Sequence, residues 1–175
     1  MNGWNPPKLT TDRLVIRAFQ VEDLEAVHAY ARAHPAGVYG SWLGGNGPTD
    51  VARYIADTGA RYGRPPRMDL GVTMGGRLVG GVAFRQVWIS PPALEVGWVL
   101  HPTVSGQGVA REAVAALISH VYGVFPEMIR LEARVRLVDA GGIKLLEGLG
   151  FEREGVLRYG AGEAGDAAIY GLLRT

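Results

Sequence analysis

The chain has 175 residues, of which 47% are hydrophobic, and this supports one domain with a real core and excludes a disordered chain. A net charge of +1 gives no reason to expect nucleic acid or an acidic membrane surface as a partner. The chain has no cysteine, its four histidines lack metal-ligand spacing, and no apolar segment has the form of a leader or a membrane span, so we expect a cytoplasmic protein without a metal.

In the first half of the chain we expect one strand, then two helices, then two further strands. Periodicity predicts a strand over 9–19, a helix over 21–32, a second helix from Thr49 to about Tyr62, and two strands within 68–89. The last two strands form a hairpin, because Gly75 and Gly76 between them accept the positive φ angles of a tight turn.

The second half predicts a regular alternation of strands and helices. We expect strands over 94–100 and 129–135, a helix between them that ends before Pro126, a short helix within 139–151, and closing strands at 155–160 and 167–174. This order predicts an α/β domain over residues 1–175, with a mixed, partly parallel sheet of about six to seven strands flanked by about four helices.

The segment VSGQGVAREA (104–113) places two glycines directly before the second-half helix. Glycines let backbone N–H groups approach a ligand closely, and a helix N-terminus adds unpaired N–H groups and a partial positive charge. This combination is typical of an anion site, commonly for phosphate. The segment matches neither a P-loop nor the GxGxxG pattern, so a plain tight turn and a simple nucleotide site stay open as alternatives.

The order LEVGWVLHP, GQGVAREA, EARV and LLEGLGFEREGVLR resembles the Gcn5-related N-acetyltransferase (GNAT) family. The opening LTTDRLVIRAF and the later GDAAIYGLL resemble its RimJ/RimL-type branch of ribosomal-protein N-terminal acetyltransferases, and the resemblance runs from about Leu9 to Arg174. It implies a GNAT-like fold and an acetyl-CoA-dependent transferase that acts on a primary amine, either a protein N-terminus or a small molecule. The enzyme would use direct attack and no metal.

The resemblance also implies where acetyl-CoA binds, in an opening between the strands at 94–100 and 129–135. The implied cofactor residues are Val99 and Leu100 for the pantetheine arm, the amides of Ser105, Gly106, Gln107, Gly108, Val109 and Ala110 for the pyrophosphate, and Asp139. Arg111 and Lys144 are further candidates for contacts with the coenzyme A phosphates, and the alternative is that they are ordinary exposed cations near helix starts. Ser105 stands where the family often has Gln or Arg, and Asp139 stands where this branch often has Asn. A carboxylate at 139 would be repelled by phosphates.

Glu95 is the candidate general base, expected to take a proton from the incoming ammonium. Strand alternation places it on the same face as Gly97 and Val99, and the alternative is a carboxylate that faces water or pairs with an arginine. The general acid is unassigned, because Leu146 and Gly142 stand where related branches have Tyr and Ser. Solvent or the product ammonium would then protonate the leaving thiolate.

Tyr39 and Trp42 lie in a glycine-rich loop and are candidates for the wall of the acceptor pocket. His101, before Pro102, is expected to shape the loop rather than contact a ligand. The departures at 139, 142 and 146 keep a second hypothesis open, a non-catalytic coenzyme A-binding module of the same fold. An edge strand would also allow a homodimer.

Overall fold

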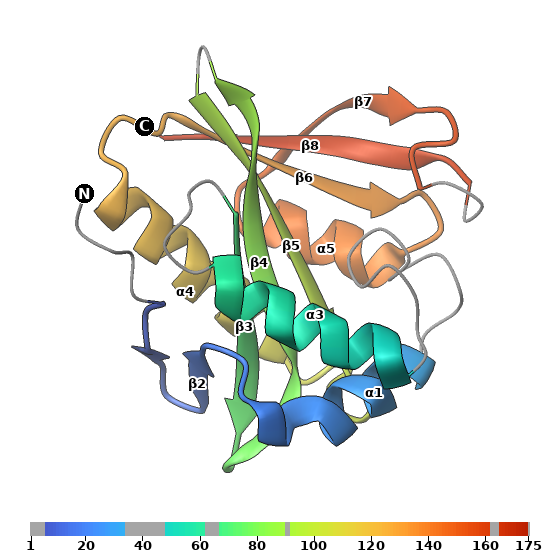
Figure 1. Cartoon of the computed structure of the whole chain (residues 1–175). Coiled ribbons are helices and arrows are strands. Elements are labelled where there is room, and N and C mark those ends of the chain that lie inside the picture. Colours follow the sequence, from blue (N-terminus) through green and yellow to red (C-terminus); the bar gives the residue numbers. More distant parts are fainter. Residues whose placement is uncertain (1–5, 34–47, 62–66, 90–91, 162–164, 175) are drawn as a thin grey trace.

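The computed structural model describes residues 6–33, 48–61, 67–89, 92–161 and 165–174. These ranges form one sheet, four α-helices and two short 3-10 helices (Figure 1). The α-helices are α1 (Leu24–Ala33), α3 (Pro48–Arg61), α4 (Val109–Val124) and α5 (Ala140–Gly148), and the 3-10 helices are η1 (Val21–Asp23) and η2 (Pro102–Val104).

The sheet has eight strands in the order β1-β2-β3-β4-β5-β6-β8-β7. The strands are β1 (Leu9–Thr10), β2 (Leu14–Arg17), β3 (Arg67–Met74), β4 (Arg77–Ile89), β5 (Pro92–Leu100), β6 (Arg130–Arg136), β7 (Glu152–Leu157) and β8 (Ala167–Leu173). Neighbouring strands are antiparallel except β5 and β6, which are parallel and joined through α4. The expected mixed α/β fold is confirmed.

The expectation of six to seven strands is wrong, because the first predicted strand folds back on itself. The Thr11 N–H donates to the Leu14 carbonyl, and the Leu14 N–H donates to Thr11 Oγ1, both at 3.0 Å. The turn lets β1 pair antiparallel with β2, with Leu9 opposite Ile16. The apolar alternation begins only at Leu14, and the polar residues 10–13 before it were included in the same predicted strand although they contain the turn.

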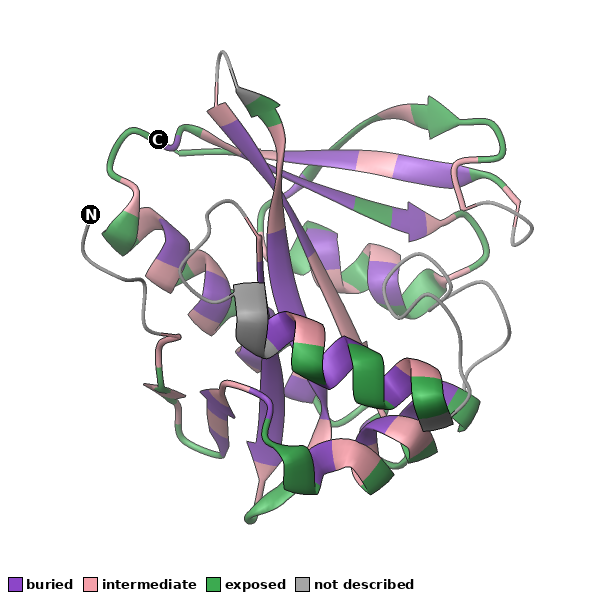
Figure 2. Cartoon of the chain, viewed as in Figure 1, coloured by how far each residue is buried: buried purple, intermediate pink, exposed green. Residues whose placement is uncertain are grey.

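Each face of the sheet packs against its own pair of helices. Side chains of α1 and α3 form one cluster, and side chains of α4 and α5 form a larger one, so the buried stripes of all four helices face the sheet (Figure 2). Residues of β5 alternate between the two clusters. Leu94 and Val96 pack with α4 and α5, whereas Val99 packs with α1 and α3. Glu95 therefore lies on the α1–α3 side, as its alternation predicts.

The parallel ladder between β5 and β6 is short. Its three register pairs end with Glu95 opposite Glu132. From there Val96–Leu100 continues beside β4, while Ala133–Arg136 continues beside β8, and the two strands part (Figure 1). The opening expected between the strands at 94–100 and 129–135 is therefore present in the sheet.

A buried carboxylate fixes the junction between β2 and α1. Both Nη atoms of Arg17 donate to Asp23, at 2.7 and 2.9 Å, and the Gln20 N–H donates to it at 2.8 Å. The Asp23 side chain is only 7% exposed. Burial by itself raises the pKa of Asp23, but the hydrogen bonds from Arg17 and Gln20 lower the pKa overall.

Replacement of this carboxylate should destabilise the fold in a pH-dependent way. We expect Asp23→Asn to lower the free energy of unfolding by about 2 kcal/mol at pH 7, because charge-assisted bonds to Arg17 are lost. The folded pKa lies below the unfolded one, so the contribution is complete above about pH 4 and is lost as the pH falls through the folded pKa. Urea unfolding at pH 7 and pH 3 measures this, with exposed Asp12→Asn as the control. Equal stability of Asp23→Asn and wild type at pH 7 would contradict the assignment.

Candidate functional site

The glycine-rich turn leads from η2 into α4 with two residues in the left-handed backbone region. Gly106 has φ 74° and Gly108 has φ 76°, values that side-chain-bearing residues rarely adopt. A Cβ built on Gly106 meets no atom within 4 Å, so the backbone there is open to solvent. The two glycines therefore permit this path of the backbone and do not cover it with side chains.

The turn presents a row of open backbone donors. The N–H groups of residues 106–110 donate to no acceptor among the described residues, and the first bonded amide after them is Glu112, which reaches the Gly108 carbonyl at 3.1 Å. The Val109 side chain is fully buried, so this residue offers only its amide. Open amides at the start of the 16-residue helix α4 create a positive potential that suits an anion.

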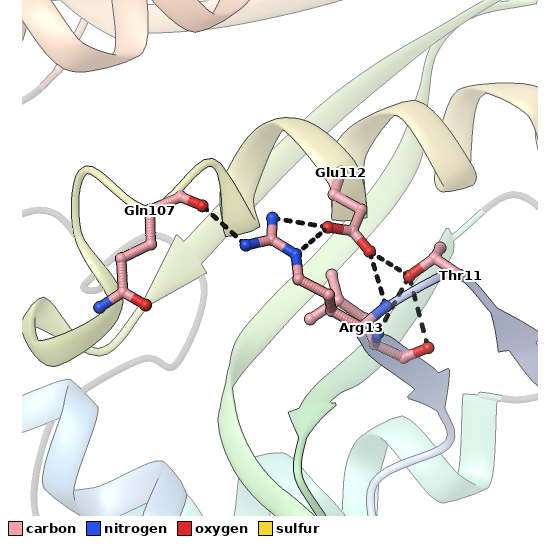
Figure 3. Close-up of polar contacts among 5 residues, drawn as sticks. Thr11, Arg13, Gln107 and Glu112 are labelled. Carbon is pink, nitrogen blue, oxygen red and sulfur yellow. Dashed lines mark hydrogen bonds and ion pairs between the residues drawn. The ribbon is translucent and has the colours of Figure 1, made fainter.

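An arginine from the β1–β2 turn clamps this loop to α4 (Figure 3). Arg13 Nη1 donates to the Gln107 carbonyl at 3.0 Å, and Arg13 Nε donates to Glu112 at 2.7 Å. Thr11 Oγ1 donates to the same carboxylate at 2.5 Å. Hydrogen bonds from Thr11 and then from Arg13 lower the pKa of the Glu112 carboxyl. The clamp joins residues nearly a hundred positions apart, and sequence analysis missed it.

Side chains within the loop hold its shape from inside. His101 Nδ1 accepts the Thr103 N–H at 3.2 Å, which caps η2. Gln107 Nε2 donates to the Thr103 carbonyl at 2.9 Å. His101 therefore shapes the loop, as expected, and the Gln107 side chain is turned back into the loop while its N–H stays open. Ser105 is exposed at the end of η2, but its N–H donates to the Pro102 carbonyl at 3.0 Å. The expectation that the Ser105 amide is open to a pyrophosphate is therefore wrong, because that amide closes the turn of η2.

Three charged candidates lie on or beside α5, and two of them have structural partners. Asp139 is the N-cap of α5 and accepts the Gly142 N–H at 2.9 Å. Arg111 donates to the Gly148 carbonyl at the end of α5 at 2.9 Å. Lys144 is exposed and forms no polar contact with another described side chain. Asp139 therefore caps α5, a role that the family resemblance did not predict.

The structure explains why positions 142 and 146 carry no proton-donating side chain. A Cβ on Gly142 would lie 2.5 Å from Val135 Cγ2 and 2.8 Å from Asp139 Oδ2, so a serine does not fit without movement. Leu146 is fully buried in the cluster under α4 and α5. Neither position can supply a proton to a ligand in this structure.

Glu95 is buried at the last β5–β6 pair, with 5% of its surface exposed. Arg85 Nη2 donates to Glu95 Oε1 at 2.9 Å. Arg134 Nε lies 3.3 Å from Oε2, but this oxygen accepts no well-aligned hydrogen bond from a described residue. The carboxylate pairs with arginine, as the structural alternative predicted, and still has one oxygen with accepting capacity beside the opening.

The remaining candidates differ in how far the structure places them. Val99 and Leu100 are half-buried on the part of β5 that has left β6. Ala110 is half-buried in the first turn of α4. Tyr39 and Trp42 lie outside the described residues.

In the described part of the chain, no group of His, Asp and Glu side chains is arranged to hold a metal ion. None of the described helices combines the length and the apolar character needed to cross a membrane.

The family model described as the acetyltransferase (GNAT) domain matches residues 13–152. The uncharacterized N-acetyltransferase p20 of Bacillus licheniformis is 28% identical over 153 residues, which cover 86% of this chain and 85% of p20. The ribosomal-protein acetyltransferase RimL, solved in complex with coenzyme A, shares the fold with a TM-score of 0.79 at 16% identity, over 95% of this chain and 98% of RimL. The self-immunity acetyltransferase MccE, solved with acetyl-CoA and AMP, does so with a TM-score of 0.77 at 16% identity, over 94% of each chain.

The clamp around the glycine turn should show as an energetic coupling between its two ends. We expect a double-mutant cycle of Arg13→Ala and Glu112→Ala to give a coupling free energy of about 1 kcal/mol, the upper end for an exposed pair, because both Nε and Nη2 of Arg13 contact the carboxylate at 2.7 Å. Urea unfolding of the four proteins at pH 7 measures it. The more loosely spaced pair Asp50 and Arg53, 3.9 Å apart, should give a coupling near zero. Equal coupling energies for the two pairs would contradict the clamp.

Proposed function

The chain belongs to the GNAT acetyltransferase family, and on this premise we propose that it transfers the acetyl group of acetyl-CoA to a primary amine. The amine nitrogen attacks the thioester carbonyl directly, forming the amide as the carbon–sulfur bond breaks and without a covalent enzyme intermediate. The observation that carries this proposal is the row of open amides at residues 106–110, beside the parting of β5 from β6. The acceptor is a protein N-terminus or a small-molecule amine.

The turn and the diverging strand suit two different parts of acetyl-CoA. Amides from Gly106 to Ala110 would bind the pyrophosphate, with the α4 dipole adding to their attraction. The backbone of β5 near Val99 and Leu100 would pair with the pantetheine arm in the place where β6 has left the ladder. Arg111 and Lys144 would contribute charge near the phosphates. Asp139 would contribute through its cap on α5.

Glu95 has the position of a general base at the inner end of this opening. Its second oxygen would accept the proton that the ammonium loses before attack, directly or through water. A backbone N–H of β5 would polarise the thioester carbonyl. Gly142 and Leu146 offer no acid, so solvent or the product ammonium would protonate the leaving thiolate. Positioning of the two substrates supplies much of the rate.

The glycine turn can be tested with two substitutions that carry the same strain. Gly106 and Gly75 both have positive φ, and neither would contact another atom through an added Cβ. We expect Gly106→Ala and Gly75→Ala to destabilise the fold alike, by about 1 kcal/mol. Only Gly106→Ala should weaken acetyl-CoA binding, by about tenfold, because its methyl group would face the pyrophosphate. Titration calorimetry measures both variants, and equal affinities would count against the turn as the phosphate site.

The base is tested by Glu95→Gln, which keeps an acceptor for Arg85 but removes the proton-accepting carboxylate. We expect kcat to fall by about a hundredfold or more, with the Kd for acetyl-CoA changed little. Thiol release with a panel of amines measures turnover, and calorimetry measures binding. Asp69→Asn, at another buried carboxylate paired with arginine, is the control and should keep kcat.

The same assay separates the enzyme from the non-catalytic module. If Glu95→Gln retained full turnover, the base assignment would be wrong. Acetyl-CoA binding without thiol release, across peptides and small amines, would instead favour a coenzyme A-binding module of this fold.

A further inference from the structure

A hollow of about 440 Å³ lies in the sheet face next to Glu95, on the side away from α4 and α5. Residues of strands β4, β6, β7 and β8 line it. Glu95 does not itself line the hollow, but Arg134 lines it and contacts Glu95, so this residue connects the hollow with the proposed base. Its polar side chains are Arg130, Glu132, Arg134 and Glu154.

Most of this charge is already internally paired. Arg130 Nη1 donates to Glu154 at 2.7 Å, and a second bond joins Arg130 Nη2 to the other Glu154 oxygen. Arg130 Nε donates to Glu132 at 3.0 Å, and Trp88 Nε1 donates to the same oxygen at 3.2 Å. These four side chains form a closed network that serves as one wall of the hollow.

Arg134, unlike Arg130, contacts described residues through only one nitrogen atom of its guanidinium. Nε faces Glu95, while neither Nη atom forms a hydrogen bond to a described residue. The side chain is 37% exposed. Arg85 and Arg134 together place two positive charges around the single negative charge of Glu95. Counted with Arg130, Glu132 and Glu154, the arginines and glutamates around the site balance in charge. Arg134 still offers two Nη atoms that have no partner among the described residues, and such a pair of donors suits a carboxylate.

The lining of the hollow also includes apolar and aromatic groups. Trp88 is 59% exposed although its indole N–H is anchored on Glu132, so the ring itself is available for contact. Val87, Val156 and Ile169 line the same hollow. An aliphatic or aromatic group placed here would be partly removed from water.

We propose that the acetyl acceptor is a small α-amino acid with an apolar side chain, rather than a peptide N-terminus. Its carboxylate binds the free Nη atoms of Arg134, its side chain lies against Trp88, and its amine lies beside Glu95. Arg134 and Glu95 are in direct contact at 3.3 Å, so a ligand that bridges them needs its amine and carboxylate close together, as they are on the single α-carbon of an amino acid. This inference rests on the proposed acetyl transfer and specifies its acceptor. Arg134 is the residue that would determine the preference.

The test compares acceptors that differ only in the carboxylate. L-leucine and L-leucinamide are assayed by thiol release, and their binding to the protein saturated with coenzyme A is measured by calorimetry, which needs no turnover. We expect KM and Kd to be about tenfold lower for L-leucine. Arg134→Gln should abolish the difference, and Arg134→Lys should retain part of it. Arg153→Gln removes the same charge from β7 opposite Tyr170, on the α5 side of the sheet, and should leave the preference intact.

The possible results distinguish this inference from the function on which it rests. Preference for L-leucine that disappears in Arg134→Gln would support it. Equal binding of the two ligands, or a preference that Arg134→Gln leaves unchanged, would overturn it even in an active enzyme. If no amine caused thiol release, the proposed transfer would fail, while the calorimetric comparison would still decide whether Arg134 binds a carboxylate.

Discussion

The functional architecture depends on the parting of β5 and β6 after Glu95 and Glu132. Two adjacent parallel strands would normally satisfy each other's backbone groups along their length. Here β5 stays with β4 and β6 stays with β8, so an opening forms inside the sheet and not at its edge. Glu95 is the last residue of β5 before the strands separate, and this places a buried carboxylate at the inner end of the opening.

In the proposed function, the glycine turn would bind the charged part of the ligand with very little side-chain chemistry. Its donors are backbone amides, so the residues that matter are those that set the path of the chain. Gly106 and Gly108 permit that path, and Arg13 holds it against α4 through Gln107 and Glu112. This explains how Ser105 can replace a larger polar residue, because the amides do not depend on the side chain at that position.

The sequence was sufficient for the features that arise from local chemistry. Paired glycines before an amphipathic helix predicted the turn, and alternation in β5 placed Glu95 on the correct face. Contacts between distant segments were not predictable, since no local pattern links Arg13 to Glu112 or Arg134 to Glu95. The capping role of Asp139 was available from the sequence, because Asp before a helix is a common N-cap, but the resemblance directed attention to its effect on phosphates.

The most direct test of this account is a crystal structure of the protein with coenzyme A. We predict that the pyrophosphate lies on the amides of residues 106–110 and that the pantetheine arm runs along β5 between Val96 and Leu100, with the thiol near Glu95. Coenzyme A bound elsewhere, or bound with its pyrophosphate away from the glycine turn, would contradict the account. An opening between β5 and β6 that stayed empty in the complex would do the same.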